Sequence, residues 1–196
     1  SSVNGNTSVS FGAKKKYGDN GMWVAVGEVT NNIAYSSDGI TWTGVIGSTS
    51  IFQNGGNDVV YNGTIWVGVA DWTGLNYSYD GINWTRVTST SIPYSGFGVA
   101  WNGTLFVAVG WGTISYSYDG MNWTGVIGST SIFSEYGFGV AWNGTLWVAV
   151  GKGTNSIAYS SDGMNWTGVA NSITNIFSTA GIGVAWNGRL WVAVGE

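Results

Sequence analysis

The sequence predicts an all-β fold, a β-propeller of four-stranded blades, on the basis of three observations. A segment that reads GVAWNGTLFVAVG at Gly98–Gly110 recurs almost unchanged at Gly139–Gly151 and Gly183–Gly195. A second block, YSYDGMNWT at Tyr116–Thr124, has close copies elsewhere in the chain. The strands that these segments suggest are rich in valine and aromatic residues, and no stretch shows the apolar period of a surface helix. Four short strands repeated every forty or so residues are typical of propeller blades.

The second block sets the length of the repeat, because each copy is centred on an Asp-Gly pair. Its aspartates stand at positions 38, 80, 119 and 162, so the spacings are 42, 39 and 43 residues. Weaker copies of the first block lie at Tyr17–Gly27 and Val59–Ala70. The chain therefore has five copies of the first block and four of the second.

The third repeat illustrates how the strands and turns are predicted. Asn102-Gly103 lies between apolar runs and predicts a tight hairpin in which both turn residues have positive φ. Asp119-Gly120 predicts a second tight hairpin in the same repeat. The four strands are expected at Phe97–Trp101, Leu105–Gly110, Ile114–Ser117 and Asn122–Val126.

The repeats indicate one propeller domain over residues 1–196, with five blades of which the fifth is incomplete. Residues 1–12 are expected to form an N-terminal closing segment. The repeat units are expected at about 13–45, 58–87, 97–126, 138–169 and 182–196.

The incomplete blade suggests how the chain associates. The strand Leu190–Gly195 reads LWVAVG, which has no charge and no proline to discourage pairing. Closure by the N-terminal segment or a homodimer through the incomplete blade would cover it, and the homodimer is slightly favoured. The alternatives are a short fifth blade and a fragment of a longer array.

Composition narrows the range of functions. The chain has no cysteine and no histidine, so thiolate chemistry is absent, as are the commonest general base and metal ligand. Charged residues make up 8% of the chain and the net charge is −4, which disfavours nucleic acid as a partner. No apolar run is long enough for a membrane helix, so no membrane insertion is expected. No metal site and no cofactor are expected.

The pattern Ser-x-Asp-Gly-x-x-Trp resembles the Asp-box, also called the bacterial neuraminidase repeat, which lies between the third and fourth strands of many propeller blades. The family's usual pattern has one more residue between Asp and Gly. The resemblance implies a structural role, in which the Asp accepts backbone N–H bonds in its own hairpin and the Trp packs between sheets. The preference of Asp for its own turn predicts the same bonds. The aspartates concerned are Asp38, Asp80, Asp119 and Asp162, and the tryptophans are Trp42, Trp84, Trp123 and Trp166.

Repeat arrays of this kind are similar to those of phage, giant-virus and bacterial surface proteins, which implies an extracellular or virion-surface location. Sialidases that contain the Asp-box repeat hold the substrate carboxylate with a cluster of arginines. This chain has only Arg86 and Arg189, in different strand contexts. We therefore expect no enzymatic activity and no catalytic residues, and a glycosidase is disfavoured.

Strand direction places the near-invariant Asn-Gly and Asp-Gly turns on one face of the propeller. The loops that follow each second strand, and the long connections between repeats, share the other face and vary from copy to copy, as expected of a binding surface. Trp72 and Trp111 have no counterpart in the other copies, and each is either a platform for a sugar ring or a cap on neighbouring loops. The candidate ligand-binding residues are Trp72, Trp111, Asp71, Tyr94, Tyr136 and Lys152.

Three kinds of function remain open at this point. The first is a lectin-like binding module with glycans as partners. The second is a structural or adhesion repeat domain of a viral or bacterial surface protein. The third is an engineered or recently amplified propeller that has no ligand.

Overall fold

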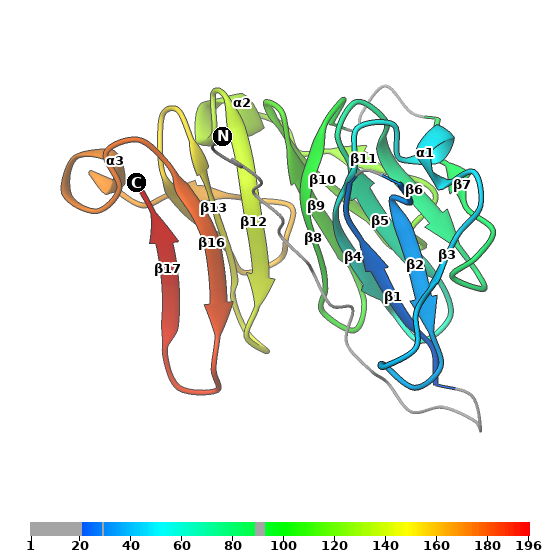
Figure 1. Ribbon diagram of the computed structural model, residues 1–196. Helices are drawn as coiled ribbons and strands as arrows, with labels where there is room; N and C mark the ends of the chain where they lie inside the picture. Colours follow the sequence, from blue (N-terminus) through cyan, green and yellow to red (C-terminus); the bar gives the residue numbers. More distant parts are fainter. Residues whose placement is uncertain (1–20, 29, 89–92) are drawn as a thin grey trace, which may run out of the picture.

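The computed structural model describes residues 21–28, 30–88 and 93–196, which form five antiparallel sheets standing side by side (Figure 1). The all-β prediction is therefore confirmed. The predicted closing segment, residues 1–12, and the beginning of the first repeat unit lie outside the described residues. No helix in the described part of the chain has the length and apolar character needed to cross a membrane.

The three middle sheets each contain four strands in chain order, which is the blade that the repeat predicts. Their strands are β4 (Gly56–Tyr61), β5 (Trp66–Ala70), β6 (Gly74–Ser78) and β7 (Thr85–Arg86); β8 (Gly96–Trp101), β9 (Phe106–Gly110), β10 (Thr113–Ser117) and β11 (Thr124–Gly125); and β12 (Tyr136–Trp142), β13 (Trp147–Lys152), β14 (Ile157–Ser160) and β15 (Thr167–Gly168).

The two outer sheets are smaller. The first has three strands and the last has two, so the last blade is incomplete within the described residues. These strands are β1 (Trp23–Val26), β2 (Ile33–Ser36) and β3 (Thr43–Gly44), and β16 (Gly181–Trp186) and β17 (Trp191–Gly195).

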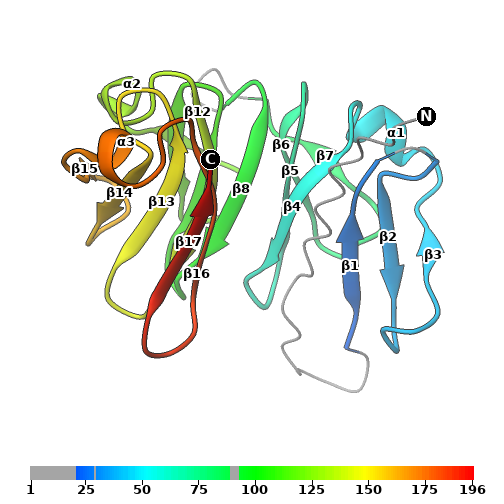
Figure 2. The same cartoon turned by 60° about the vertical axis from the view of Figure 1, so that its left-hand side comes forward.

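The sheets follow one another in an arc, with the first sheet (β1–β3) and the last sheet (β16 and β17) at its two ends (Figures 1 and 2). Contacts run from β1 to β4, from β4 to β8, from β8 to β12 and from β12 to β16. Polar side chains also link neighbouring sheets, since Asp58 Oδ2 accepts the Val99 backbone N–H at 3.0 Å and Asn57 donates to the Gly96 carbonyl at 2.8 Å. These links join the innermost strands of the second and third sheets.

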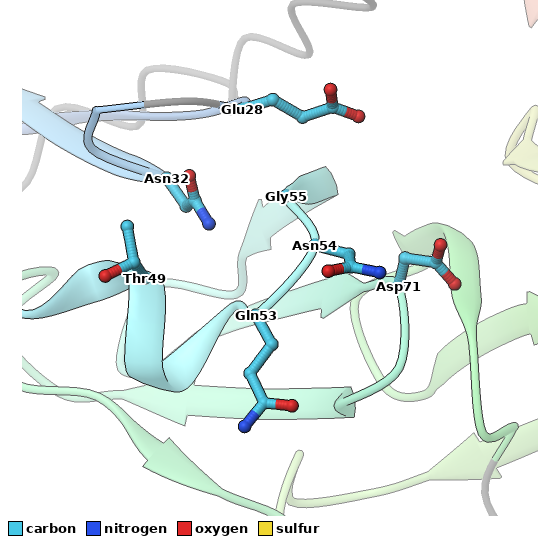
Figure 3. A pocket seen from close by; sticks show the side chains of 7 residues that line it. All are labelled: Glu28, Asn32, Thr49, Gln53, Asn54, Gly55 and Asp71. Atoms are coloured by element: carbon cyan, nitrogen blue, oxygen red, sulfur yellow. The ribbon is translucent and has the colours of Figure 1, made fainter.

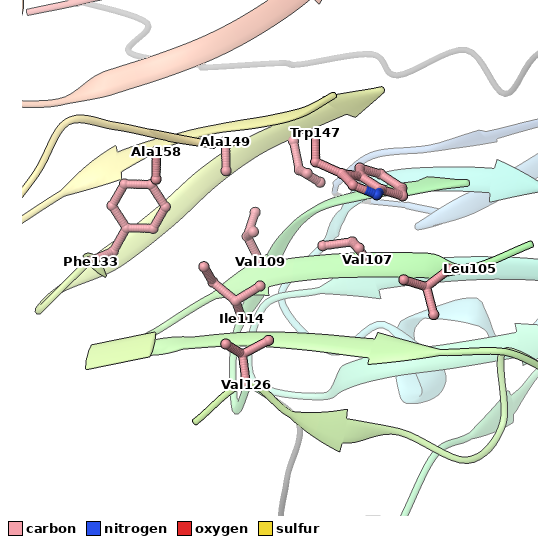
Figure 4. Close-up of a cluster of buried hydrophobic side chains, with 10 residues drawn as sticks. Leu105, Val107, Val109, Ile114, Val126, Phe133, Trp147, Ala149 and Ala158 are labelled. Carbon is pink, nitrogen blue, oxygen red and sulfur yellow. The ribbon is translucent and has the colours of Figure 1, made fainter. Parts of the chain in front are cut away.

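The hydrophobic core is divided among the gaps between sheets. In one gap, Leu105, Val107 and Val109 of the third sheet face Trp147 and Ala149 of the fourth (Figure 4). Equivalent clusters fill the gaps between the first and second sheets and between the second and third. Burial of valines and large rings between twisted sheets is the packing expected of neighbouring blades.

The Asn-Gly hairpins differ from the prediction. Gly103 has φ of 101°, whereas Asn102 is not among the residues with positive φ, so the prediction that both turn residues have positive φ is wrong. Trp101 pairs with Phe106, which leaves four residues in the loop. Asn102 Oδ1 closes it by accepting the backbone N–H groups of the third and fourth loop residues at 2.8 and 2.7 Å. The hydrogen bonds that the Asn102 side chain accepts therefore stabilise the turn in place of a second residue with positive φ.

The fourth strands are shorter than predicted. β11 contains only Thr124 and Gly125, because the Asp119 carboxylate holds the N–H groups of Met121 and Asn122 in the turn before it. The structure also adds three one-turn helices to the connections, which periodicity could not reveal at that length. They are α1 (Ser48–Ile51), α2 (Ser129–Ile132) and α3 (Ser172–Asn175).

Candidate functional site

The four Asp-Gly turns share one hydrogen-bonded design. In the third sheet, Asp119 Oδ1 accepts the backbone N–H groups of Met121 and Asn122 at 2.9 and 2.7 Å. The Ser117 hydroxyl donates to the same oxygen and accepts the Gly120 N–H at 2.8 Å. The same pattern recurs in the other three turns, centred on Asp38, Asp80 and Asp162.

These hydrogen bonds stabilise the ionised carboxylates. Burial raises the pKa of Asp119, but hydrogen bonds from the side chain and backbone of Asn122 and from the Met121 backbone outweigh burial and lower the pKa to about 2. The same balance lowers the pKa of Asp80 to about 2. A backbone N–H is the largest cause of the lowered pKa in the two other copies, Asp38 and Asp162. Each carboxylate therefore accepts its hydrogen bonds from groups of its own turn.

The tryptophans of these turns differ in burial, depending on the position of their blade in the arc. Trp84 and Trp123 are buried, and each donates its indole N–H to the carbonyl of the turn glycine at 3.0 Å. Trp42 and Trp166 are only half-buried. Trp42 belongs to the first sheet, which has no described sheet packed on its outer side. Burial of the motif tryptophan thus holds for two of the four copies.

On the opposite face, four of the six candidate ligand-binding residues form a continuous row. The ring centroids of Trp72 and Tyr94 are 6.4 Å apart, those of Tyr94 and Trp111 are 6.5 Å apart, and those of Trp111 and Tyr136 are 6.1 Å apart. Trp72, Tyr94 and Trp111 are 53%, 57% and 55% exposed, and Tyr136 is half-buried. We call these four residues the aromatic row.

Each end of the aromatic row is anchored in a different way. Tyr136 is supported from behind by Phe97 and Phe138, whose ring centroids lie 5.9 and 5.6 Å from its own. An isolated bridge between Trp111 and Tyr136 ties the loop of the third sheet to the first strand of the fourth. The row therefore spans blades, and its geometry depends on how they pack.

Trp72 has an unusual backbone conformation. Its φ is 62°, in the left-handed region that large side chains rarely adopt. Its backbone N–H donates to Asp71 Oδ1 at 3.1 Å and to the Ser95 hydroxyl at 3.3 Å. In the equivalent loop of the third sheet, Gly112 is the residue with positive φ, at 59°. A strained residue that carries an exposed ring points to a functional position.

A polar cavity of about 570 Å³, whose lining is drawn in Figure 3, includes Asp71, the residue directly before Trp72. Its lining joins the first two sheets and is rich in amides and carboxylates. With the Asn54 amide oriented so that its oxygen faces the indole, Trp72 Nε1 donates to it at 3.1 Å. Asp71 belongs to this cavity, not to the row of rings. The lining residues are Glu28, Asn32, Thr49, Gln53, Asn54, Gly55 and Asp71.

Lys152 lies at the other end of the site and is already paired. Its Nζ is 2.8 Å from Glu135 Oε2, and the hydrogen bond that the ammonium group donates to this carboxylate raises the pKa of Lys152. Glu135 directly precedes Tyr136, so the ion pair borders the aromatic row. Within the described residues, no three His, Cys, Asp or Glu side chains are placed to hold a metal ion together.

Sequence reasoning missed several parts of this site. Phe97 and Phe138 lie in predicted strands, where nothing distinguishes a ring that supports a ligand surface from one in the core. Asn54 and Gln53 lie in a connection that varies between copies, which was the one available signal. Glu28 also lies at a variable loop position, but its place in the same cavity as Asp71 depends on the packing of two sheets.

A scan with protein-family models gives no match, and a comparison with curated protein sequences gives none either. Several solved β-propeller structures are similar. The computationally designed Ika8 protein has a TM-score of 0.62 and 14% identity, over 93% of this chain and 54% of that one. YCF48 from Cyanidioschyzon merolae has a TM-score of 0.59 and 18% identity, over 94% of this chain and 62% of that one.

An enzyme is also among the similar structures. The GH74 enzyme of Niastella koreensis has a TM-score of 0.53 and 19% identity, over 78% of this chain and 22% of that one. This chain thus spans less than two thirds of the length of each of the three proteins. At such identities the likeness shows the fold alone. The chain is built from β-propeller blades.

Proposed function

We propose that the chain is a glycan-binding module without catalytic activity, and that the aromatic row is its binding surface. The observation that carries the proposal is the row itself: four rings from three blades, spaced 6.1 to 6.5 Å apart, on the face whose loops vary between repeats. The spacing is on the scale of one sugar ring, so successive rings can each meet a successive unit of an oligosaccharide.

The chemistry of the surface suits sugars. An aromatic face packs against the C–H face of a pyranose, and phenol O–H groups can hydrogen-bond to sugar hydroxyls. The indole N–H of Trp72 already donates to Asn54 and fixes the orientation of the ring. The neighbouring cavity offers the carboxylate of Asp71 and the amides of Asn54 and Gln53, which can donate to and accept from hydroxyl groups. Apolar surface combined with a few directed polar groups is the usual composition of a small-molecule site.

The residues have distinct roles in this proposal. Trp72, Tyr94 and Trp111 stack on sugar units, and Tyr136 closes the row beside the ion pair of Glu135 and Lys152. Lys152 orients the bound sugar more than it attracts it electrostatically, because Glu135 already compensates the lysine charge. The four turn aspartates remain structural, since their oxygens are engaged on the opposite face.

A glycan array probed with the folded protein tests the proposal. Wild type should bind one class of sugar, and Trp111→Ala should lose this signal, because the substitution removes the apolar surface of one stacked ring and interrupts the row. Tyr79→Ala and Tyr118→Ala are matched controls. These exposed tyrosines lie at the far ends of β6 and β10 from the loops that carry Trp72 and Trp111. Both controls should bind as wild type does.

Two outcomes would overturn the proposal. One is silence of the wild type across a broad array, which would favour the structural or adhesion role. The other is a signal that survives Trp111→Ala but is lost in a control variant, which would move the site to the face with the Asp-Gly turns.

A further inference from the structure

A second polar cavity, of about 400 Å³, is formed by the third sheet and the connection that follows it. Gly112, which directly follows Trp111 of the aromatic row, is part of its lining, so the cavity borders the row. Among the described residues, no charged side chain lines it. The lining consists of three glycines, Val126 and four residues with hydroxyl groups, which are Thr113, Thr124, Ser129 and Thr130.

The Ser129 hydroxyl has counterparts in two other repeats, where the chain itself supplies a hydrogen-bond donor. Ser48 Oγ accepts the backbone N–H of Asn32 at 3.0 Å. Ser172 Oγ accepts the backbone N–H of Ser156, also at 3.0 Å. Each of these serines begins the one-turn helix of its connection, as Ser129 does. Within the described part of the chain, however, Ser129 Oγ has no hydrogen-bond partner, although the residue is only 6% exposed.

A shorter loop in the third sheet explains the missing donor. Residues 27–32 lie between the last paired positions of β1 and β2, and residues 151–156 lie between the corresponding positions of β13 and β14. Only residues 110–113 lie between the corresponding positions of β9 and β10, and of these Thr113 is itself paired with Gly110. The segment that meets the serine in the other two repeats is therefore held in the hairpin, and the cavity takes its place.

We propose that this cavity receives the acetamido group of an N-acetylated sugar whose ring lies on Trp111. An acetamido group is a secondary amide, the same chemical group as the peptide unit that donates to the serine in the first and fourth sheets. Its N–H donates to Ser129 Oγ, its carbonyl accepts from a threonine hydroxyl, and its methyl group contacts Val126. The inference rests on the proposed glycan binding and names the class of sugar.

The loop between the ring and the cavity is fixed on both sides. The backbone N–H of Trp111 donates to the Ser95 carbonyl at 2.9 Å, and the backbone N–H of Gly112 donates to the Glu135 carbonyl at 2.8 Å. Trp111 and the cavity therefore keep a constant relative position. One sugar unit can stack on the ring and place its substituent in the cavity without reordering the loop, which reduces the entropic cost of binding.

The neutral lining selects against charged substituents. The ammonium group of an unacetylated amino sugar would leave water for a cavity whose described lining has no carboxylate to pair with it. A hydroxyl group is neutral, but it fills little of the cavity and has no carbonyl to accept from the threonines. The expected order of preference is therefore acetamido, then hydroxyl, then ammonium.

Isothermal titration calorimetry with matched sugars tests the inference. Chitotriose, cellotriose and triglucosamine share one backbone and differ at C2, which carries acetamido, hydroxyl and ammonium groups respectively. Wild type should bind chitotriose roughly 10-fold or more tightly than the other two, because the acetamido group adds two hydrogen bonds. N-acetylgalactosamine and galactose provide the same comparison for the C4 epimer.

Two variants locate the preference. Ser129→Ala should weaken binding of the acetylated sugar by about 2- to 12-fold, the effect of one net hydrogen bond, and leave binding of its unacetylated counterpart unchanged. Trp111→Ala should weaken both sugars of a pair, because both use the ring.

Ser172→Ala is the matched control, with a readout that needs no ligand. It removes the same hydroxyl from the fourth repeat, where the Ser156 N–H depends on it, so it should lower the melting temperature and leave the sugar preference unchanged. Ser129→Ala should melt close to wild type in the absence of sugar, because its hydroxyl has no partner in the chain to lose.

Four outcomes would overturn the inference. Equal affinity for both sugars of each pair, with both weakened by Trp111→Ala, excludes the acetamido site and leaves the proposed glycan binding intact. A preference for the acetamido group that Ser129→Ala does not reduce places that group elsewhere. A melting temperature lowered as much by Ser129→Ala as by Ser172→Ala shows that the hydroxyl has a structural role. Failure of all these sugars to bind also overturns the inference, whereas the proposed function falls only if the broad glycan array is silent too.

Discussion

The left-handed conformation of Trp72 can be tested by comparing two substitutions that both remove the ring. Trp72→Ala leaves a Cβ at φ of 62°, whereas Trp72→Gly does not. Holding a residue with a Cβ in that region costs about 1–2 kcal/mol. Glycine loses about 0.5–1 kcal/mol more backbone entropy than alanine on folding. We therefore expect Trp72→Gly to be about 1 kcal/mol more stable than Trp72→Ala.

The loss of the ring, of its contact with Tyr94 and of its bond to Asn54 is common to both variants and cancels in the comparison. In a domain of this size, about 1 kcal/mol corresponds to about 2–4 °C in melting temperature, which differential scanning calorimetry resolves. Both variants should lose glycan binding to the same extent, because neither carries the ring.

Trp111 provides the matched control, since its φ is not positive. There the order should reverse, with Trp111→Ala more stable than Trp111→Gly by about 0.5–1 kcal/mol. If Trp72→Ala were as stable as Trp72→Gly or more so, Trp72 would not occupy the left-handed conformation, and the argument for a strained functional position would fail.

Three further predictions concern the turns. Asp119→Ala should lower stability by about 1–2 kcal/mol in urea titrations, because two backbone N–H groups lose their acceptor, while glycan affinity stays unchanged; reduced affinity at full stability would make this aspartate part of the site. The carboxylates of Asp80 and Asp119 have a pKa of about 2 in the folded protein against about 3.9 when unfolded, so their contribution is complete above the unfolded pKa and is lost as pH falls through the folded pKa. Melting temperature should accordingly drop between about pH 4 and pH 2, and a flat profile over that range would contradict the assigned hydrogen bonds. Gly163→Ala should cost about 1–3 kcal/mol more than Gly188→Ala in calorimetry, since both have positive φ but only Gly163 packs on a neighbouring blade; equal costs would rule out that close contact.

Much of the fold could be predicted from the sequence because each blade repeats the same strand and turn motifs. The alternation of valine and aromatic residues around Asn102-Gly103 identifies two strands and the turn between them without knowledge of the neighbouring blade. What failed was conformational detail: the Asn side chain replaces a second residue with positive φ, and the Asp119 carboxylate shortens the strand that follows. Both differences arise from side chains that bond to their own backbone, which a pattern of apolar residues does not record.

The site was predictable only in part, because it forms between blades. Trp72 and Trp111 could be singled out as residues without counterparts in other repeats. Their link through Tyr94 depends on where this residue lies between the two loops, which packing sets. Asp71 shows the limit most clearly: it directly precedes Trp72 in the sequence, yet it lines the polar cavity instead of joining the row.

Isothermal titration calorimetry with oligosaccharides of increasing length tests the aromatic row most directly. Chito-, cello- and malto-oligosaccharides of one to six units serve as probes. If the four rings form one continuous site, affinity for the bound class should rise with each added unit up to about four and then level off, because each stacked unit buries further apolar surface until no ring is left. Trp111→Ala, which interrupts the row, should end the increase at shorter chains, and Tyr118→Ala should reproduce the wild type. An affinity that does not depend on length, or that Trp111→Ala leaves unchanged, would contradict the account.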